Sequence, residues 1–382
     1  MLKKSASNST EEGIEQIEVT ERNKTESLKK AFLQTSYFLI SLICLSKETM
    51  AIILGIESSC DETSASVCIN GKVINNEIAG QDVHAQYGGV VPELASREHH
   101  KNIVPIIDLV LKNAQIALNQ LDAIAYTRGP GLLGALLVGS SFAKAMAASL
   151  SIPTIPIHHM KAHVLAHFIE DPKPEFPFLC LTVSGGHTQI LKVDSPYEMQ
   201  ILGQTIDDAV GEAFDKAAKL LGLPYPGGPL IDKLALDGDP NSFQFSEPVV
   251  GNLDYSFSGV KTSILYFLQK EIRRNRNFIS ENINNLAASI QDTLVRMLLA
   301  KLEKAASQFG INQIAIAGGV SANSHLRNEL TKLAAVNDWN TYIPDFQYCT
   351  DNAGMISLSG HLMFEAELFG SLEDSPLSRM PF

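Results

Sequence analysis

The sequence predicts an α/β protein with two lobes and a duplicated core, and three observations support this prediction. The chain has 382 residues, of which 45% are apolar and 19% charged, which is enough for two cores at roughly 150 residues per domain. Strand-like apolar runs alternate with longer helical patterns, as in α/β proteins. A strand, polar turn and return strand occur twice, about 128 residues apart, which indicates an internal repeat.

The elements of the first lobe follow one another with clear breaks. An apolar strand is expected over 52–56, followed by a polar turn and a return strand over 64–69. A further strand over 123–127 ends at a Gly-Pro turn. The apolar segment 131–150, rich in small residues, then predicts a buried helix.

The second repeat begins with strands over 178–183 and 189–193 around a Gly-Gly turn. A strand over 313–317 then leads through two glycines into a helix over 324–333, an arrangement that presents backbone N–H groups to an anion. Apolar residues at helical spacing predict a long amphipathic helix over 283–309.

Residues 1–49 differ from the rest. This leader contains seven glutamates, six of them in a polar start that precedes an apolar run over 31–46. This run is short for a membrane span, and it lacks the small-residue cleavage site of a signal peptide. We expect the fold to begin at Met50 and 1–49 to be an unmatched leader outside it, with a membrane tether as the alternative.

Charge and cysteine content narrow the functional classes. The net charge of −12 argues against nonspecific coating of nucleic acid, so RNA binding would need a local basic patch or a partner. The five cysteines are widely spaced and include no C-x-x-C pair. This pattern argues against a disulfide framework and favours a reducing compartment.

Two histidines form a candidate metal site. His159 and His163 are four residues apart and share one face if their segment is helical. Met160 stands where a zinc protease of the H-E-x-x-H type has its catalytic glutamate, so peptide hydrolysis by that mechanism is not expected. Asp351 is a candidate third ligand. The alternatives are a polar helix face for the histidines and a helix N-cap for Asp351.

Further polar clusters allow two interpretations each. Asp208, Glu212 and Asp215 are spaced to share one helix face, which is either solvated or binds sugar hydroxyls. The Tyr225–Pro229 turn either exposes backbone to a flat ligand or is an ordinary loop. The segment from Tyr87 to Lys101 either contacts phosphate or is a solvated basic helix face. A second basic cluster, which either binds tRNA or ends a solvated helix, comprises Lys270, Arg273, Arg274 and Arg276.

Nine short motifs occur in a fixed order along the chain. They are G-I-E-S-S-C-D-E-T (55–63), G-G-V-V-P-E-L-A-S-R (88–97), H-H-M-x-x-H (158–163), V-S-G-G-H-T (183–188), D-D-A-x-G-E-A-F-D-K (207–216), Y-P-G-G-P (225–229), Y-S-F-S-G-V-K-T (255–262), A-G-G-V-S-A-N (317–323) and C-T-D-N (349–352). In this order they resemble the tRNA N6-adenosine threonylcarbamoyltransferase family, the bacterial TsaD type formerly called O-sialoglycoprotein endopeptidase. The resemblance covers about 330 residues from Met50 onward.

The resemblance implies the actin/Hsp70/sugar-kinase fold, with a ligand cleft between two lobes. Residues 50–158, joined by 347–382, would form the first lobe and residues 159–346 the second. The implied reaction transfers threonylcarbamoyl from threonylcarbamoyl-AMP to N6 of adenine 37 in tRNAs that read ANN codons, and releases AMP. A metallopeptidase and an ATP-binding chaperone or scaffold of the same fold are the alternatives.

The resemblance also implies site residues, a cofactor and partners. One divalent metal, with iron expected and zinc or magnesium as alternatives, would be bound by His159, His163 and Asp351. Partners of the TsaB and TsaE types and a cytoplasmic location without membrane attachment are expected. Some relatives carry tyrosine at position 182, where this chain has a shorter threonine. The residues that match substrate-binding positions are Thr182, Val183, Ser184, Gly185, Gly186, Asp215, Gly228, Asp232 and Asn323.

Overall fold

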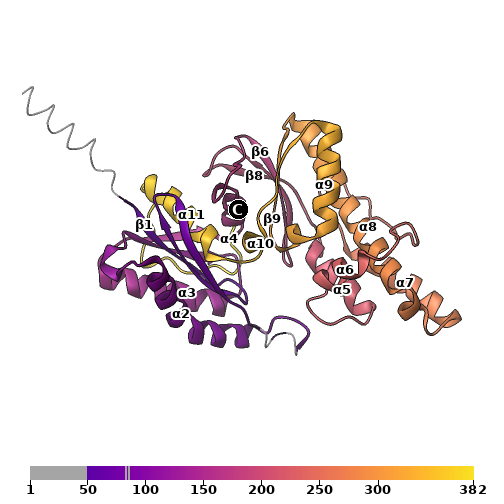
Figure 1. The fold of residues 1–382 in the computed structure, drawn as a ribbon, viewed down its shortest axis with the longest axis horizontal. Coiled ribbons are helices and arrows are strands. Elements are labelled where there is room, and N and C mark those ends of the chain that lie inside the picture. The colour runs from indigo at the N-terminus through magenta and orange to yellow at the C-terminus, as the bar shows by residue number, and fades with distance from the viewer. Residues whose placement is uncertain (1–49, 82–83, 85–86) are drawn as a thin grey trace, which may run out of the picture. The chain divides into compact units, whose positions relative to one another are not determined.

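The computed structural model describes residues 50–81, 84 and 87–382 (Figure 1). Residues 51–382 form one compact unit. The expectations for the leader, residues 1–49, lie outside the described part of the chain.

The first sheet has the strand order β3-β2-β1-β4-β5. Its central strand β1 pairs antiparallel with β2 and parallel with β4. Strands β1 and β2 are almost entirely buried, which agrees with their nearly continuous apolar sequences. The strands are β1 (Ile52–Glu57), β2 (Thr63–Ile69), β3 (Lys72–Ala79), β4 (Ala123–Gly129) and β5 (Thr154–His158).

The second sheet repeats this plan in the order β10-β9-β6-β7-β8. Its central strand β6 pairs antiparallel with β7 and parallel with β9, as β1 does with β2 and β4. The predicted duplication is therefore confirmed at the level of strand pairing. The strands are β6 (Phe178–Val183), β7 (Thr188–Val193), β8 (Met199–Gln204), β9 (Gln313–Ala317) and β10 (Asn340–Tyr342).

Helices cover both faces of the first sheet (Figure 1). Leu54 and Ile56 of β1 pack into the same cluster as α2 and α3, whereas Ile53 packs with Met355 and Ile356 of α11. This division follows from the alternation of side chains along a strand. The helices are α2 (Pro92–Ala114), α3 (Leu133–Leu150) and α11 (Ala353–Glu365).

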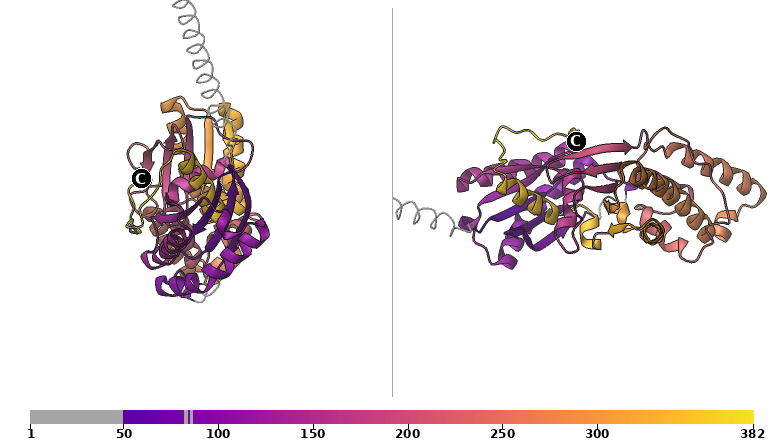
Figure 2. Two further views of the ribbon diagram at one scale, coloured as in Figure 1. Left: turned by 90° about the vertical axis from the view of Figure 1, so that its left-hand side faces the viewer. Right: turned by 90° about the horizontal axis from the view of Figure 1, so that it is seen from above.

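One face of the second sheet is covered by several helices, and the short helix α4 lies against β6 and β9 on the other face (Figure 2). Leu179 and Leu181 of β6 face the large core of the helices that follow β8 in the chain, and Cys180 faces Val164 of α4. The predicted long helix over 283–309 is part of α8. The helices are α4 (His159–Leu165), α5 (Val210–Leu220), α6 (Gly228–Ala235), α7 (Ser258–Arg274), α8 (Phe278–Phe309), α9 (Ser324–Asn337) and α10 (Phe346–Cys349).

The segment 131–150 forms α3 as predicted, but the helix is not buried all round. One face packs on the first sheet, while Leu133 and Leu137 are 50% and 46% exposed. Because a helix on one face of a sheet buries one side only, an apolar sequence did not ensure full burial. Among the described residues, α3 is also the single helix whose length and composition would let it cross a membrane.

The predicted division into lobes at 158/159 and 346/347 remains a proposal. It is supported by α11, which packs against β1, β2 and β4 although it lies near the end of the chain. Helix α4 contacts both sheets, because Ala162 packs in one core cluster and Val164 in the other. The segment from His159 onward is therefore held from two sides.

Candidate metal centre and substrate-binding turns

Helix α4 places two histidines on one face, as the sequence spacing predicted. It begins directly after β5, and the side chain of His158 caps it by accepting a hydrogen bond from the Lys161 amide. His159 and His163 are both buried. Met160 is also buried, with 2% of its surface exposed, so an apolar side chain fills the position of the protease glutamate.

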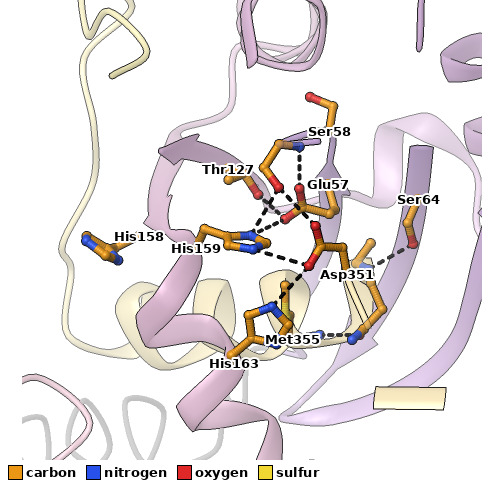
Figure 3. A network of polar contacts seen from close by, with 12 residues as sticks. Glu57, Ser58, Ser64, Thr127, His158, His159, His163, Asp351 and Met355 are labelled. Carbon is orange, nitrogen blue, oxygen red and sulfur yellow. Dashed lines mark hydrogen bonds and ion pairs between the residues drawn. The ribbon is translucent and has the colours of Figure 1, made fainter. Parts of the chain in front are cut away.

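The third candidate ligand, Asp351, lies between α10 and α11. The alternative interpretation of Asp351 as a helix N-cap is wrong. The neighbouring Asn352 caps α11 instead, because its side chain accepts the amide hydrogen bond of Met355. Asp351 is therefore free of a capping role, and its carboxylate points toward α4 (Figure 3).

The three side chains converge (Figure 3). Asp351 Oδ1 lies 3.1 Å from His163 Nε2 and 3.3 Å from His159 Nε2. One ligand atom from each residue lies within 4.8 Å of the others. Nitrogen and oxygen ligands bind divalent transition metals at about 2.0–2.2 Å, which places neighbouring ligand atoms about 3 Å apart. The arrangement therefore fits a divalent cation.

The buried charges of this cluster depend on one another. Burial by itself would lower the pKa of His159, but Asp351 and Glu57 raise it well above its ordinary value. Burial would likewise raise the pKa of Asp351, but the two imidazoles hold it well below its usual range. The carboxylates of Asp351 and Glu57 thus favour positive charge at this cluster, supplied by a protonated imidazole or by a bound cation.

Sequence reasoning gave no role to Glu57, which the structure places beside the cluster. Its side chain is fully buried, and Oε2 lies 3.1 Å from His159 Nδ1. The available signal was a glutamate at the end of an apolar strand, a position where an unpaired charge would be costly.

The Ser184–Gly186 turn joins β6 to β7, and the two residues before it are less accessible. The Thr182 hydroxyl donates to the backbone oxygen of Gln189, and Val183 packs in the core of the second sheet. Ser184 Oγ accepts hydrogen bonds from the Gly186 and His187 amides. Of the five predicted residues 182–186, only Ser184 to Gly186 therefore present accessible atoms.

The predicted acidic face over 208–215 is wrong in part. Helix α5 begins at Val210, so Asp208 lies outside it. Asp208 and Glu212 both pair with Lys216 at 2.7 Å, which offsets their repulsion. Asp215 instead accepts the amides of Gly227 and Gly228 at 2.8 and 3.3 Å and holds that turn at the start of α6.

Asp232 and Asn323 are brought together by a residue that sequence reasoning did not single out. Nε2 of Gln291 lies 2.7 Å from Asp232 Oδ1 and 3.1 Å from Asn323 Oδ1. Asp232 also accepts both the amide and the hydroxyl of Ser324. A cavity of about 200 Å³ adjoins this network, lined in part by Asp232, Gln291 and Ser324.

The basic segment on α2 matches its solvated alternative better than a phosphate site. Arg97 pairs with Glu93, and Lys101 pairs with Glu98, all on the helix surface. His99 is buried, with its two ring nitrogens near the Thr63 hydroxyl and the Cys60 backbone oxygen.

Solved structures of other proteins share this fold. Full-length HypF in its phosphate- and nucleotide-bound form matches with a TM-score of 0.59 at 14% identity, over 85% of this chain and 48% of that one. HypF of T. kodakarensis matches with a TM-score of 0.56 at 16% identity, over 86% of this chain and 49% of that one. At such identity the likeness concerns the fold alone, and the predicted two-lobed actin/Hsp70/sugar-kinase type is confirmed.

Sequence comparison is more specific. Residues 72–358 match the family model described as TsaD: tRNA N6-adenosine threonylcarbamoyltransferase. Proteins bearing this name include one from Riemerella anatipestifer, 54% identical over 332 residues, which span 86% of this chain and 97% of that protein. The Porphyromonas gingivalis protein is 53% identical over 334 residues, or 86% and 98% of the two chains. The motifs, the fold and these relatives agree, and the chain belongs to the tRNA N6-adenosine threonylcarbamoyltransferase family.

Proposed function

We propose that this chain transfers the threonylcarbamoyl group from threonylcarbamoyl-AMP to N6 of adenine 37 in tRNAs that read ANN codons. The observation that carries the proposal is the match to relatives of that name over 97–98% of their length. The new bond joins N6 to the carbamoyl carbon, and the bond from that carbon to the AMP phosphate oxygen breaks. The departing phosphate can accept the N6 proton.

The metal site is part of the proposal. His159, His163 and Asp351 would hold one divalent cation, Fe²⁺ in the first instance with Zn²⁺ or Mg²⁺ as alternatives. When bound, such a cation supplies Lewis acidity at positions left open by three protein ligands. The protein's part is to keep both imidazoles on one face of a short, buried helix and to bring a carboxylate to them.

The adenylate would lie against the turns of the second sheet. The exposed Gly185 amide offers a hydrogen-bond donor suited to a phosphate, whereas the Ser184 and Gly186 amides already donate to the His187 backbone oxygen and to Ser184 Oγ. Asp215 supports this by fixing the turn that contains Gly228. Asp232 lines the 200 Å³ cavity, and Gln291 links it to Asn323; these two residues are suited to bind hydroxyl or amino groups of the nucleoside. Because the acyl group is already activated, such positioning supplies much of the catalysis.

Thr182 and Val183 are the remaining members of the proposed substrate-binding set. They would act through their backbone atoms or by supporting the Ser184–Gly186 turn. The Thr182 hydroxyl donates to Gln189, and the Val183 side chain is buried in the core. A tyrosine at position 182 could extend farther than threonine, so the substrate contacts here would differ from those of relatives with that residue.

Two features of the chain support the proposed partner proteins: its net charge and its exposed apolar side chains. With a net charge of −12, the chain would need a local basic region or partner proteins of the TsaB and TsaE types to hold tRNA. A TsaB-type protein would contact the first lobe, where Val104, Leu109, Leu133 and Leu137 of α2 and α3 are 45–57% exposed. Modification of tRNA with these partners would place the protein in the cytoplasm.

A transfer assay tests this function. The protein from Met50 onward is mixed with threonylcarbamoyl-AMP, TsaB- and TsaE-type partners and unmodified ANN-reading tRNA. The modified adenosine is then measured by mass spectrometry of the digested RNA. Product that disappears with a chelator and with His163→Ala supports the proposal. The matched control is His158→Asn, because asparagine can still cap α4 and the site retains all three ligands.

The same assay separates the alternative functions. A folded, metal-loaded protein that forms no product with active partners would contradict the transferase proposal. ATP turnover that is unaffected by His163→Ala would then favour a chaperone or scaffold of the same fold. A metallopeptidase would cleave a protein substrate, a reaction that the buried Met160 side chain cannot assist as a general base.

A further inference from the structure

Glu57 is a fully buried carboxylate to which the proposed reaction assigns no step. It ends β1, the central strand of the first sheet, and lies against the ligand cluster (Figure 3). A buried carboxylate is retained only where it is paired and hydrogen-bonded. Its surroundings therefore indicate what it does.

We propose that Glu57 is a positioning residue that holds the imidazole of His159 in the tautomer and orientation required of a metal ligand. This inference rests on the metal site proposed above and deepens it. Glu57 does not touch the metal or the substrate in this role and acts only through His159.

Three elements fix the Glu57 carboxylate itself. Oε1 accepts the Ser59 amide at 2.5 Å, and Oε2 accepts the Thr127 hydroxyl at 2.6 Å. Oε2 also lies 3.1 Å from His159 Nδ1. The carboxylate is thus held by the β1–β2 turn and by β4 while it faces α4. A side chain held in this way can fix the rotation of the ring that it contacts.

The direction of the His159 ring follows from this contact. An ionised carboxylate only accepts hydrogen bonds, so Nδ1 must carry the proton that it shares with Glu57. The lone pair then belongs to Nε2, which lies 3.3 Å from Asp351 Oδ1 and so within the ligand cluster. A carboxylate behind a metal-bound histidine fixes the tautomer and increases the basicity of the ligand atom.

The second histidine provides an internal comparison. His163 Nδ1 has no hydrogen-bond partner among the described residues. Among the described residues, therefore, the His159 imidazole has a carboxylate, that of Glu57, at its Nδ1 atom, and the His163 imidazole has none. The charge balance supports the same role for Glu57. A divalent cation bound by two neutral imidazoles and the Asp351 carboxylate keeps one positive charge. The Glu57 carboxylate neutralises this charge in a buried site.

Ser59 is the competing explanation and must be tested separately. Its Oγ lies 3.3 Å from His159 Nδ1 and 3.4 Å from Asp351 Oδ2, so the hydroxyl could orient the same ring. Both contacts are longer than the one from Glu57, and a hydroxyl carries no charge. Ser59→Ala should therefore affect metal binding less than loss of the carboxylate does.

The experiment measures metal affinity directly. Apo-protein of wild type, Glu57→Leu, Glu57→Gln and Ser59→Ala is titrated with Co²⁺ and followed by its visible absorption, then with competing Zn²⁺. We expect Glu57→Leu to weaken binding by about 10–100-fold, the effect typical of losing such a partner. Glu57→Gln should lose less, because its amide oxygen can still accept from Nδ1. The control Asp122→Asn removes a carboxylate that binds the opposite end of β1 and should leave affinity unchanged.

A spectroscopic measurement distinguishes orientation from general damage. In the Zn²⁺-loaded wild type, ¹⁵N spectra of the imidazoles should show a protected Nδ1–H for His159, and Glu57→Leu should abolish that protection while the His163 signals persist. If Glu57→Leu does not fold, Glu57→Gln and Thr127→Val provide the same comparison. If folded Glu57 variants keep wild-type metal affinity and an unchanged His159 signal, the inference about Glu57 is wrong, while the proposed metal site still stands. Failure of the wild type to bind either metal would overturn the metal site itself.

Discussion

Asp351 Oδ1 lies 3.1 Å from His163 Nε2, although 188 residues separate the two in the chain. A shared core brings them together. Ala162 of α4 and Ala166, the residue that follows the helix, pack in the same apolar cluster as Met355 and Ile356 of α11. The position of the carboxylate therefore depends on packing of the C-terminal helix against the first sheet, and disruption of that packing would separate the ligands.

Gln291 should control binding of the adenylate. Its Nε2 lies within hydrogen-bond distance of both Asp232 and Asn323, and its Oε1 is buried without a partner among the described residues. Gln291→Leu removes one hydrogen bond from each of Asp232 and Asn323, which keep their bonds from Ser324 and Leu326, and we expect a loss of about 1–3 kcal/mol. We expect roughly a 10-fold rise in KM for threonylcarbamoyl-AMP or in Kd for AMP, measured by steady-state kinetics and calorimetry.

The control for Gln291 is Thr293→Val on the same buried helix. Within the described part of the chain, the Thr293 hydroxyl bonds only to the Ser289 backbone oxygen, also in α8. It should therefore leave nucleotide affinity unchanged. Equal losses in the two variants would indicate general damage to α8 and would contradict a specific role of Gln291.

The basic cluster at the end of α7 should contribute to tRNA binding. Arg274 pairs with Glu271, but Arg273 and Arg276 are exposed and have no carboxylate within 4.0 Å among the described residues. Charge reversal of Arg273 and Arg276 together should weaken tRNA binding. The slope of log affinity against log salt should fall by about 0.7–0.9 for each tRNA phosphate that the variant no longer neutralises.

Filter binding over a series of salt concentrations measures that slope. Lys332→Glu on α9 is the control, because this exposed lysine already pairs with Glu329. A slope that stays at its wild-type value in the arginine double variant would remove the cluster from the tRNA-binding surface.

Acid should destabilise the protein partly through His167. Burial lowers the pKa of this histidine to about 4, and its Nε2 lies 3.0 Å from the backbone oxygen of Ile316. The unfolded state has a pKa near 6.5 and so binds more protons between about pH 4 and 6.5, where the free energy of unfolding must fall as pH falls. We expect His167 to account for a loss of about 1 kcal/mol between pH 7.5 and 5.5.

Urea unfolding at pH 7.5 and 5.5 checks this sign and size. His167→Gln is expected to lower stability at pH 7.5 but to reduce the difference between the two pH values. A variant with the full wild-type pH dependence would show that His167 does not cause it.

Gly129 should be required for docking of the C-terminal segment. A Cβ at this position would overlap the backbone oxygen of Leu377. Nearby, the Leu377 amide donates to the backbone oxygen of Arg128 at 2.8 Å. Gly129→Ala must displace this segment, and we expect a loss of about 1–3 kcal/mol, measured as a lower Tm. Gly80→Ala is the control, because a Cβ there meets no atom of the described residues within 4 Å. An equal loss in both variants would contradict the steric explanation.

Local features of the protein could be predicted from sequence because they depend on neighbours in the chain. The i, i+4 spacing put His159 and His163 on one helix face, and apolar runs identified three strands of each sheet, namely β1, β2 and β4 of the first and β6, β7 and β9 of the second. The order of nine motifs identified the family, since such an order over about 330 residues is specific. The same reasoning went wrong where a boundary mattered, as at Asp208, because periodicity does not show where a helix begins.

Relations between distant residues were decided only by the tertiary structure. Sequence suggested Asp351 as a ligand but could not show that it reaches His163, and it assigned no role to Glu57 or Gln291. These contacts join residues 32 to 188 positions apart. They form because the two sheets and the helices on them pack closely in one arrangement, which brings these residues together. A pattern along the chain records which residues are polar, but only packing determines which of them meet.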